Sequence, residues 1–92
     1  MESHFVYILR SQKDGKYYIG STSDIDARVR FHNAGLQRST KSRIPFMLVY
    51  SEVCSSKSEA LKREKQIKSY KGGEAFKKLF DTGSGPAFPA GY

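Results

Sequence analysis

One dipeptide, Asp14-Gly15, constrains the fold of this chain more than any other feature of the sequence. Asp-Gly between two apolar runs is the strongest short-range signal for a β-hairpin, because both residues tolerate the positive φ angles of a tight turn. Residues 4–10 (HFVYILR) precede it and residues 16–20 (KYYIG) follow it, and both runs favour β-strands. The sequence therefore predicts an antiparallel strand pair at the centre of the domain.

The expected two-residue turn also determines which side chains share a face of this hairpin. It would pair Ser11 with Tyr18, and directly opposed residues lie on one face while faces alternate along each strand. We therefore expect Tyr7 to project from the same side of the sheet as Tyr18 and Gly20.

Helix and strand signals alternate after the hairpin. Ser23 is a candidate N-cap for a helix over residues 24–33, and Gly35 is its expected stop. Residues 46–54 (FMLVYSEVC) predict a third strand, and residues 56–59 (SKSE) predict the capped start of a second helix.

This second helix is expected to end at Gly72-Gly73, and residues 74–80 then predict a short third helix. Its core-facing residues would be Ala75, Phe76, Leu79 and Phe80. Three strands and three helices in this order predict a small α+β domain, a mainly antiparallel three-stranded sheet flanked by helices. We assign residues 1–80 to this domain and residues 81–92, rich in Gly and Pro, to a flexible tail.

The charge of the chain is concentrated in two segments. Sixteen Lys and Arg against nine Asp and Glu give a net charge of +7. Residues 28–43 contain five basic and no acidic residues, and residues 57–79 contain eight basic and three acidic residues. Dense basic regions favour a phosphate-bearing partner such as nucleic acid. A basic solvated surface, or affinity for an anionic membrane surface, is the alternative.

Length and cysteine usage exclude several classes of protein. The 92 residues suffice for one domain, and no apolar stretch approaches the roughly 20 residues that span a bilayer. Cys54 is the single cysteine, so no internal disulfide forms. The first residues lack the pattern of a signal peptide. We therefore expect a cytoplasmic protein without a membrane partner.

Glu64 is the most informative single residue. On a helix it lies with Ala60 and Ile67 on the one apolar stripe, where a carboxylate is costly unless it pairs with a cation. Mg²⁺ suits a single carboxylate, because this ion keeps most of its waters. A salt bridge to Arg28 or a lysine, or a position at the edge of the stripe, is the structural alternative. The spacing of the two histidines and one cysteine excludes a structural zinc site.

Four further residues become informative only in combination. Tyr7, Tyr18, Arg28 and His32 each have an ordinary packing explanation. Together with Glu64 they suit phosphodiester hydrolysis, which needs a base for water, positive charge at phosphorus and a metal near the leaving oxygen.

The spacing of these residues resembles that of the GIY-YIG endonuclease family. Phe5-Val6-Tyr7 stands at the first triplet, and Tyr18-Ile19-Gly20 is the second triplet intact. The resemblance covers residues 4–80 and is strongest to short stand-alone bacterial members, related to the nuclease domain of excision-repair proteins. Two departures are the Phe5-Val6 pair in place of Gly-Ile, and the absence of an asparagine after Glu64.

The resemblance implies an endonuclease that uses Mg²⁺, with Mn²⁺ as a substitute. Tyr7 would be the general base or position the water, and Arg28 would stabilise charge on the phosphoryl oxygens. Glu64 would bind the metal. Tyr18 would orient water or phosphate, and His32 would assist proton transfer by a hydrogen bond. Because a free tyrosine has a pKa near 10, Tyr7 needs cationic neighbours to act as a base.

The resemblance also implies a nucleic-acid substrate, DNA in preference to RNA, with a role in DNA repair or recombination. A protein partner or a homo-oligomer would supply targeting. We assign substrate contacts to Gly20, Ser21, Arg30, Arg38, Lys41, Arg43 and Lys68. The alternatives are a weakly active or non-catalytic nucleic-acid-binding module of the same fold, and a protein-interaction domain without salt-dependent nucleic-acid affinity.

Overall fold

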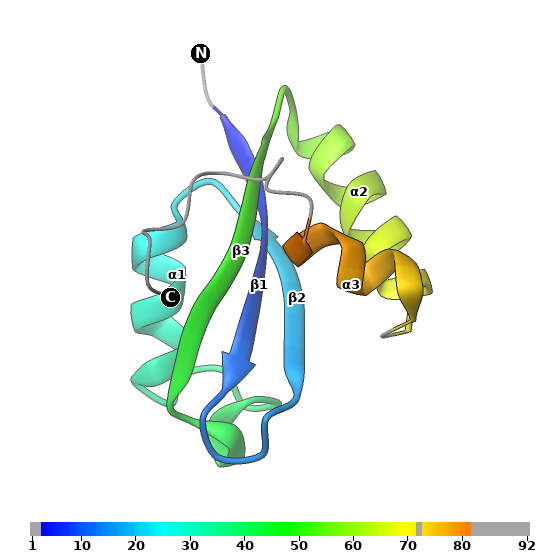
Figure 1. Cartoon of the computed structure of the whole chain (residues 1–92). Coiled ribbons are helices and arrows are strands. Elements are labelled where there is room, and N and C mark those ends of the chain that lie inside the picture. The colour runs from blue at the N-terminus through cyan, green and yellow to red at the C-terminus, as the bar shows by residue number, and fades with distance from the viewer. Residues whose placement is uncertain (1–2, 72, 82–92) are drawn as a thin grey trace.

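The computed structural model of the chain describes residues 3–71 and 73–81, and these residues form one α+β unit (Figure 1). The residues predicted as a tail lie, from residue 82 onward, outside this description. The elements are β1 (His4–Ser11), β2 (Tyr17–Thr22), α1 (Ile25–Asn33), the short 3-10 helix η1 (Lys41–Arg43), β3 (Phe46–Cys54), α2 (Lys57–Ser69) and α3 (Glu74–Asp81).

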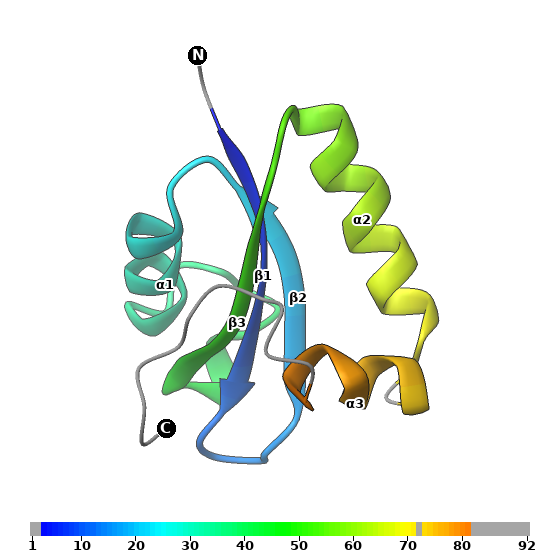
Figure 2. The ribbon, with the colours of Figure 1, turned by 45° about the horizontal axis from the view of Figure 1, so that its top comes forward.

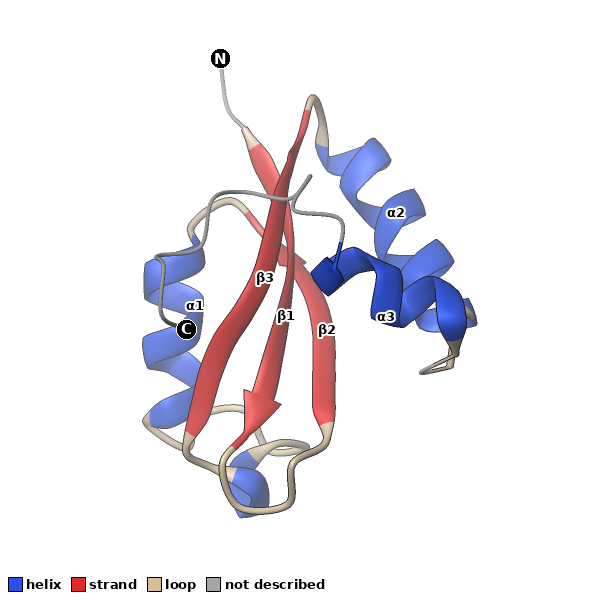
Figure 3. Ribbon diagram, in the orientation of Figure 1, coloured by secondary structure: helices blue, strands red, loops and turns tan. Residues whose placement is uncertain are grey.

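The three strands of the described residues form one sheet in the order β2-β1-β3, with both pairs antiparallel (Figure 3). This confirms the predicted fold class. The pairing of β1 with β3 shifts between Ile8 and Leu9. Tyr50 lies opposite Ile8 and Leu48 lies opposite Leu9, so the irregularity falls at Val49. The shift keeps the apolar residues of β3 in phase with those of β1 on both faces.

The sheet lies between two helical layers, with α1 on one face and α2 and α3 on the other (Figures 1 and 2). Alternate residues of β1 supply the two cores. Val6 and Ile8 are fully buried among Ala60, Ile67 and Phe76 on the side of α2 and α3. The other residues of β1 point to the opposite side, where the cluster around α1 consists of Tyr7, Leu9 and Phe46 with the partly buried Tyr18, Val29, Ile44 and Leu48.

The hairpin register differs by two residues from the predicted one. Tyr18 pairs with Leu9, not with Ser11, because the connection is a longer loop than the two-residue turn that Asp14-Gly15 indicated. The Ser11 hydroxyl accepts hydrogen bonds from the backbone N–H groups of Lys13 and Asp14, and this side chain holds the loop open. A shift of two residues preserves the faces, so Tyr7, Tyr18 and Gly20 still share one side, as predicted.

The helix ends follow their capping residues closely. Asp24, not the predicted Ser23, caps α1, and its carboxylate accepts a hydrogen bond from the backbone of Ala27. Ser56 caps α2 as predicted. Gly35 has a φ of 76°, which suits the residue after a helix end. In α3, Phe76 is buried as expected, whereas Ala75 is exposed because it lies on the outer side of this short helix.

The end of α1 is fastened to the start of β3 by one side chain. The amide nitrogen of Asn33 donates to the carbonyl oxygen of Phe46 (3.1 Å), and the Asn33 carbonyl oxygen accepts from the backbone N–H of Phe46 (2.7 Å). This pair of bonds fixes the height of His32, the preceding residue, above the sheet. No helix within the described ranges is both long and apolar enough to cross a membrane.

Candidate active site

Two tyrosines from neighbouring strands form the floor of the candidate site. The ring centroids of Tyr7 and Tyr18 are 6.3 Å apart on the α1 side of the sheet. Gly20, directly opposite Tyr7 in the sheet, leaves room for them, because a Cβ at Gly20 would lie 2.6 Å from the Tyr7 hydroxyl. We expected Gly20 to let a substrate approach. Gly20 is buried and the Tyr7 phenol occupies the space beside it, and a substrate contact at Gly20 stays a prediction.

His32 of α1 lies against this floor. Its Nε2 atom is 3.2 Å from the hydroxyl oxygen of Tyr7, and both residues are almost completely buried. The imidazole ring also packs against Tyr18, with ring centroids 4.8 Å apart. The structure therefore brings together the histidine and both tyrosines that the sequence identified.

Thr40 completes this cluster, and the sequence did not predict it. Its hydroxyl oxygen is 2.9 Å from Nδ1 of His32 and 3.3 Å from the carbonyl oxygen of Gln37. Thr40 is 1% exposed although it lies in a segment that reads as a polar, basic loop. No local pattern marks it, because its role depends on how the loop folds back over α1.

Burial determines the protonation of Tyr7. Loss of solvent, and then the neighbouring Tyr18, raise the pKa of Tyr7 well above its ordinary value, and the charge of Glu64 adds to the rise. Arg28 acts in the opposite direction, as we expected, but it does not overcome these effects. Tyr7 is therefore a neutral phenol at neutral pH, not a phenolate poised by Arg28 alone.

Burial has the opposite effect on His32, because its charged form is the cationic one. Loss of solvent, followed by the charge of Arg28, lowers the pKa of His32. The imidazole is therefore neutral at neutral pH, and one of its nitrogens is free to accept a hydrogen bond.

Arg28 lies at the edge of the cluster, partly buried. Its guanidinium carbon is 5.0 Å from the centroid of the Phe31 ring, and its charge acts on both Tyr7 and His32. A cavity of about 230 Å³ adjoins it. The residues that line this cavity are Thr22, Asp24, Ala27, Arg28 and Phe31. Of the candidate site residues, Arg28 is the one that lines this cavity.

Glu64 lies on α2, which packs on the face of the sheet opposite to α1, and its link to the tyrosine cluster is electrostatic. Ala60 and Ile67 on the same stripe are fully buried, whereas 18% of the Glu64 side chain is exposed. One of its carboxylate oxygens, Oε2, pairs with Lys68 Nζ at 2.6 Å, which is one of the structural alternatives that the sequence left open. Its charge also acts on Tyr7, so it belongs to the same electrostatic environment as the tyrosine cluster.

The donor set fits a hydrated ion held by a single carboxylate. Among the described residues, no three His, Cys, Asp or Glu side chains gather around a common point. Within the same residues, the second carboxylate oxygen of Glu64, Oε1, has no hydrogen-bond partner and is available as a ligand. Mg²⁺ is well suited to such a site, because it retains several waters and takes other ligands from phosphate.

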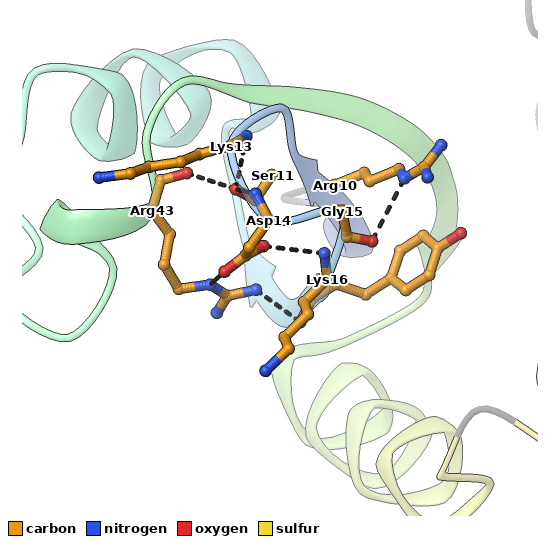
Figure 4. A network of polar contacts seen from close by, with 8 residues as sticks. Arg10, Ser11, Lys13, Asp14, Gly15, Lys16 and Arg43 are labelled. Carbon is orange, nitrogen blue, oxygen red and sulfur yellow. Dashed lines mark hydrogen bonds and ion pairs between the residues drawn. The ribbon is translucent and has the colours of Figure 1, made fainter.

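Two of the predicted substrate-contacting cations are engaged within the protein. Arg43 pairs with Asp14 through Nε (3.1 Å) and donates to the carbonyl oxygen of Tyr17, so that it fastens the loop before β3 to the hairpin (Figure 4). The Arg43 carbonyl oxygen also accepts from Ser11. Lys68 is bound to Glu64. Each has an anionic partner inside the domain, so a contact with phosphate would require that ion pair to open, and their assignment as phosphate contacts stays a prediction.

The remaining predicted contacts differ in their exposure. Arg30, Arg38 and Lys41 are exposed on or after α1. Ser21 is half-buried and lies opposite Val6, so it belongs to the face of the sheet that α2 covers. Of these four residues, the three cations are therefore the accessible ones.

Comparison with known proteins agrees with this geometry. The model of the GIY-YIG catalytic domain matches residues 3–77. The chain belongs to the GIY-YIG family. The UPF0213 proteins of Staphylococcus aureus strains Mu50 and COL are each 52% identical to it over 71 residues, which cover 76% of this chain and 85% of theirs.

A solved structure also resembles this one. The solution NMR structure of the UPF0213 protein BH0048 from Bacillus halodurans is 34% identical, with a TM-score of 0.51, over 90% of this chain and 86% of that one. The chain therefore carries the catalytic domain of a nuclease family and is similar to UPF0213 proteins. Membership implies a nucleic-acid substrate, and nucleases of this family generally depend on a divalent metal ion.

Proposed function

We propose that this GIY-YIG protein is a Mg²⁺-dependent endonuclease that hydrolyses phosphodiester bonds, with DNA as its substrate in repair or recombination. The observation that carries the proposal is the buried hydrogen bond between the Tyr7 hydroxyl and His32 Nε2, within reach of the charges of Arg28 and Glu64. A phenol and a neutral imidazole in contact can receive a proton from water, and the arginine can stabilise the charge that develops on phosphate.

Tyr7 acts as a proton relay in this proposal. It takes a proton from the attacking water while it passes its own proton to Nε2 of His32, so no free phenolate accumulates. The bond between the water oxygen and phosphorus forms, and the bond between phosphorus and the leaving oxygen breaks. The leaving oxygen takes a proton from solvent, and His32 holds the proton from Tyr7 until it returns to solvent. Tyr18 orients the water or the phosphate.

Glu64 would hold the metal ion, with Lys68 displaced from the carboxylate. When bound, the ion would neutralise charge near the leaving oxygen. Mn²⁺ would substitute, because it accepts the same oxygen ligands. Lys68 neutralises Glu64 in the absence of the ion, and it would be free to approach phosphate once the ion takes its place.

The exposed cations Arg30, Arg38 and Lys41 would contact the phosphate backbone beside the site. Such contacts fix position without reading sequence, so a protein partner or a homo-oligomer would supply targeting. We place the enzyme in the cytoplasm, where its one cysteine would stay reduced.

The direct test incubates the purified chain with labelled duplex, single-stranded, flap and branched DNA and with matching RNA. Each substrate is tested with Mg²⁺, with Mn²⁺ and with EDTA. We expect Mg²⁺-dependent cleavage of DNA that EDTA abolishes and that Glu64→Gln reduces by roughly 10²-fold or more. Glu59→Gln is the matched control, because Glu59 lies on the outer side of the same helix and is exposed.

Cleavage that persists in Glu64→Gln would remove the metal site from the proposal. Tight, salt-dependent binding without cleavage under either metal would instead support the binding module. RNA cleavage in preference to DNA would correct the substrate class.

A further inference from the structure

Thr40 has features of a residue that acts on the site through His32. It lies in the loop that follows α1 with its side chain buried, and the only side chain within the described ranges that its hydroxyl contacts is His32. It lies behind the imidazole and bonds to Nδ1, while Nε2 faces Tyr7. The threonine, the histidine and the tyrosine thus form one linear chain of hydrogen bonds.

The protons in this chain can be placed by accounting for each donor. The hydroxyl of Tyr7 is buried, and within the described part of the protein Nε2 of His32 is its hydrogen-bond partner. If Nε2 carried a proton, the Tyr7 hydroxyl proton would have no acceptor there, and an unsatisfied buried donor costs about 1–3 kcal/mol. Nε2 is therefore bare and accepts from Tyr7.

The other end of the chain leads to the same assignment. The Thr40 hydroxyl has one proton, and it donates this proton to the Gln37 carbonyl oxygen at 3.3 Å. Towards His32 it can then only accept, so Nδ1 carries the imidazole proton and donates to Thr40 Oγ1 at 2.9 Å. Both ends select the tautomer with the proton on Nδ1.

We propose that Thr40 is a positioning residue that holds His32 in the Nδ1–H tautomer, so that Nε2 is always the atom that receives the Tyr7 proton. This inference rests on the proposed function for its catalytic consequence, and the assignment of the tautomer stands apart from it. The opposite tautomer would present an N–H to Tyr7 and could not accept its proton. Thr40 does not transfer a proton itself. Its oxygen keeps accepting from Nδ1 when His32 becomes an imidazolium, and so stabilises the charged state.

The test records the imidazole nitrogen resonances of the folded protein by ¹⁵N NMR at a pH where His32 is neutral. The chain has only two histidines, so a His4→Gln variant assigns the signals of His32. We expect a protonated Nδ1 and a bare Nε2 in the unchanged protein and in Thr40→Ser, which keeps the hydroxyl. Thr40→Val, which keeps the shape and loses the hydroxyl, should shift the population toward Nε2–H.

Cleavage assays on the same variants measure the consequence. Thr40→Val should lower kcat roughly tenfold or more with little change in KM, and Thr40→Ser should restore most of it. Ser42→Ala, an exposed hydroxyl in the same loop, is the control and should change neither measurement. The proton spectrum of each variant shows that it is folded.

A proton found on Nε2 in the unchanged protein, or a Thr40→Val spectrum identical to it, would overturn the inference. The predicted tautomer in a protein that cleaves no substrate would leave the role of Thr40 toward His32 intact and would refute the proposed function instead. Equal kcat in all three Thr40 forms of an active enzyme would refute the catalytic consequence.

Discussion

The two faces of the sheet use the same strand for different purposes. On the side of α2 and α3, Val6 and Ile8 are completely buried in an apolar cluster. On the side of α1, the next residue along, Tyr7, is just as deeply buried but leads into a chain of polar groups through His32 to Thr40. One face therefore contributes mainly to stability. On the other face, the buried polar groups hold the protons of Tyr7, His32 and Thr40 in a defined arrangement.

The difference shows how a small domain can hold buried polar groups at low cost. No buried side-chain nitrogen or oxygen in the described residues lacks a hydrogen bond, so the polar face avoids the penalty of unsatisfied groups. The apolar face supplies the rigidity on which this arrangement depends. Substitutions on the two faces should therefore separate activity from stability.

The largest effect is expected on the polar face. Tyr7→Phe removes the proton relay and should lower cleavage by roughly 10²–10⁴-fold, while DNA affinity changes little. Steady-state cleavage and binding titrations measure the two quantities. Tyr17→Phe, on the other face of the same hairpin, is the control and should keep full activity. Normal cleavage by Tyr7→Phe would contradict the assignment of activity to the polar face.

The apolar face should respond in the opposite way. Ile8→Ala leaves a cavity among Val6, Ala60 and Ile67 and should lower the free energy of unfolding by about 2–5 kcal/mol. Urea unfolding measures this change, and the folded fraction should cleave at the normal rate. Ile8→Val gives a milder step for the case in which Ile8→Ala does not fold. A change in kcat without a change in stability would contradict the assignment of stability to the apolar face and activity to the polar face.

Gly20→Ala should affect both properties, because its Cβ would enter the polar face. The added carbon would lie 2.6 Å from the Tyr7 hydroxyl and push the phenol away from His32. We expect a loss of about 1–3 kcal/mol in stability from overpacking, together with reduced cleavage. Ile19→Val, on the adjacent position of the other face, should alter stability alone. A fully active Gly20→Ala variant would show that the position of Tyr7 is not critical.

The pH dependence of cleavage should report on His32. Because burial and Arg28 lower the pKa of His32, cleavage should be flat through the ordinary histidine range near 6.5 and fall about tenfold per pH unit only in more acidic solution. The unfolded chain binds the proton first as pH falls, so the stability contributed by neutral His32 is complete above about pH 6.5 and declines below it. An inflection above pH 6.5 in the cleavage profile would contradict the buried neutral state. His4→Gln is the control and should not change the pH at which cleavage begins to fall.

The smallest effect is expected for the segment between α1 and β3, which contains Arg38, Lys41 and Arg43. Arg43→Gln breaks a partly exposed ion pair with Asp14 and should lower stability only slightly, without changing the salt dependence of DNA binding. Arg38→Gln and Lys41→Gln should each reduce the slope of log affinity against log salt by about one, because each would lose a phosphate contact. Affinity measured over a salt series separates the two roles. An equal slope change in all three variants would return Arg43 to the substrate surface.

Local patterns predicted those parts of the molecule that depend on neighbouring residues. The strand over residues 46–54 and the Ser56 cap were correct, because alternation and capping act within a few residues. The predicted α1 cap was wrong by one residue. Both Ser23 and Asp24 can accept a hydrogen bond at a helix start, and the path of the backbone between β2 and α1 decides which of them does so. The hairpin register was wrong because the Ser11 side chain, not Asp14-Gly15 alone, shapes the loop.

The candidate site was predictable where its residues lie on regular elements. Period two placed Tyr7 and Tyr18 on one face of the hairpin, and period 3.6 placed Glu64 on the α2 stripe with Ala60 and Ile67. Contacts between distant segments could not be read in this way. Thr40 behind His32 and Arg43 against Asp14 both depend on the path of the loop that joins α1 to β3, for which the sequence gives no periodicity.

The fit of the Tyr7 phenol over the bare backbone of Gly20 joins the two triplets into a single packing unit across the strand pair. A protein engineer who transplants this candidate site to another scaffold must carry both positions together, at opposed places on adjacent strands. Any library that varies one of them while holding the other fixed will sample mostly defective chains. The two triplets are thus related in space, because the glycine of the second leaves room for the tyrosine of the first.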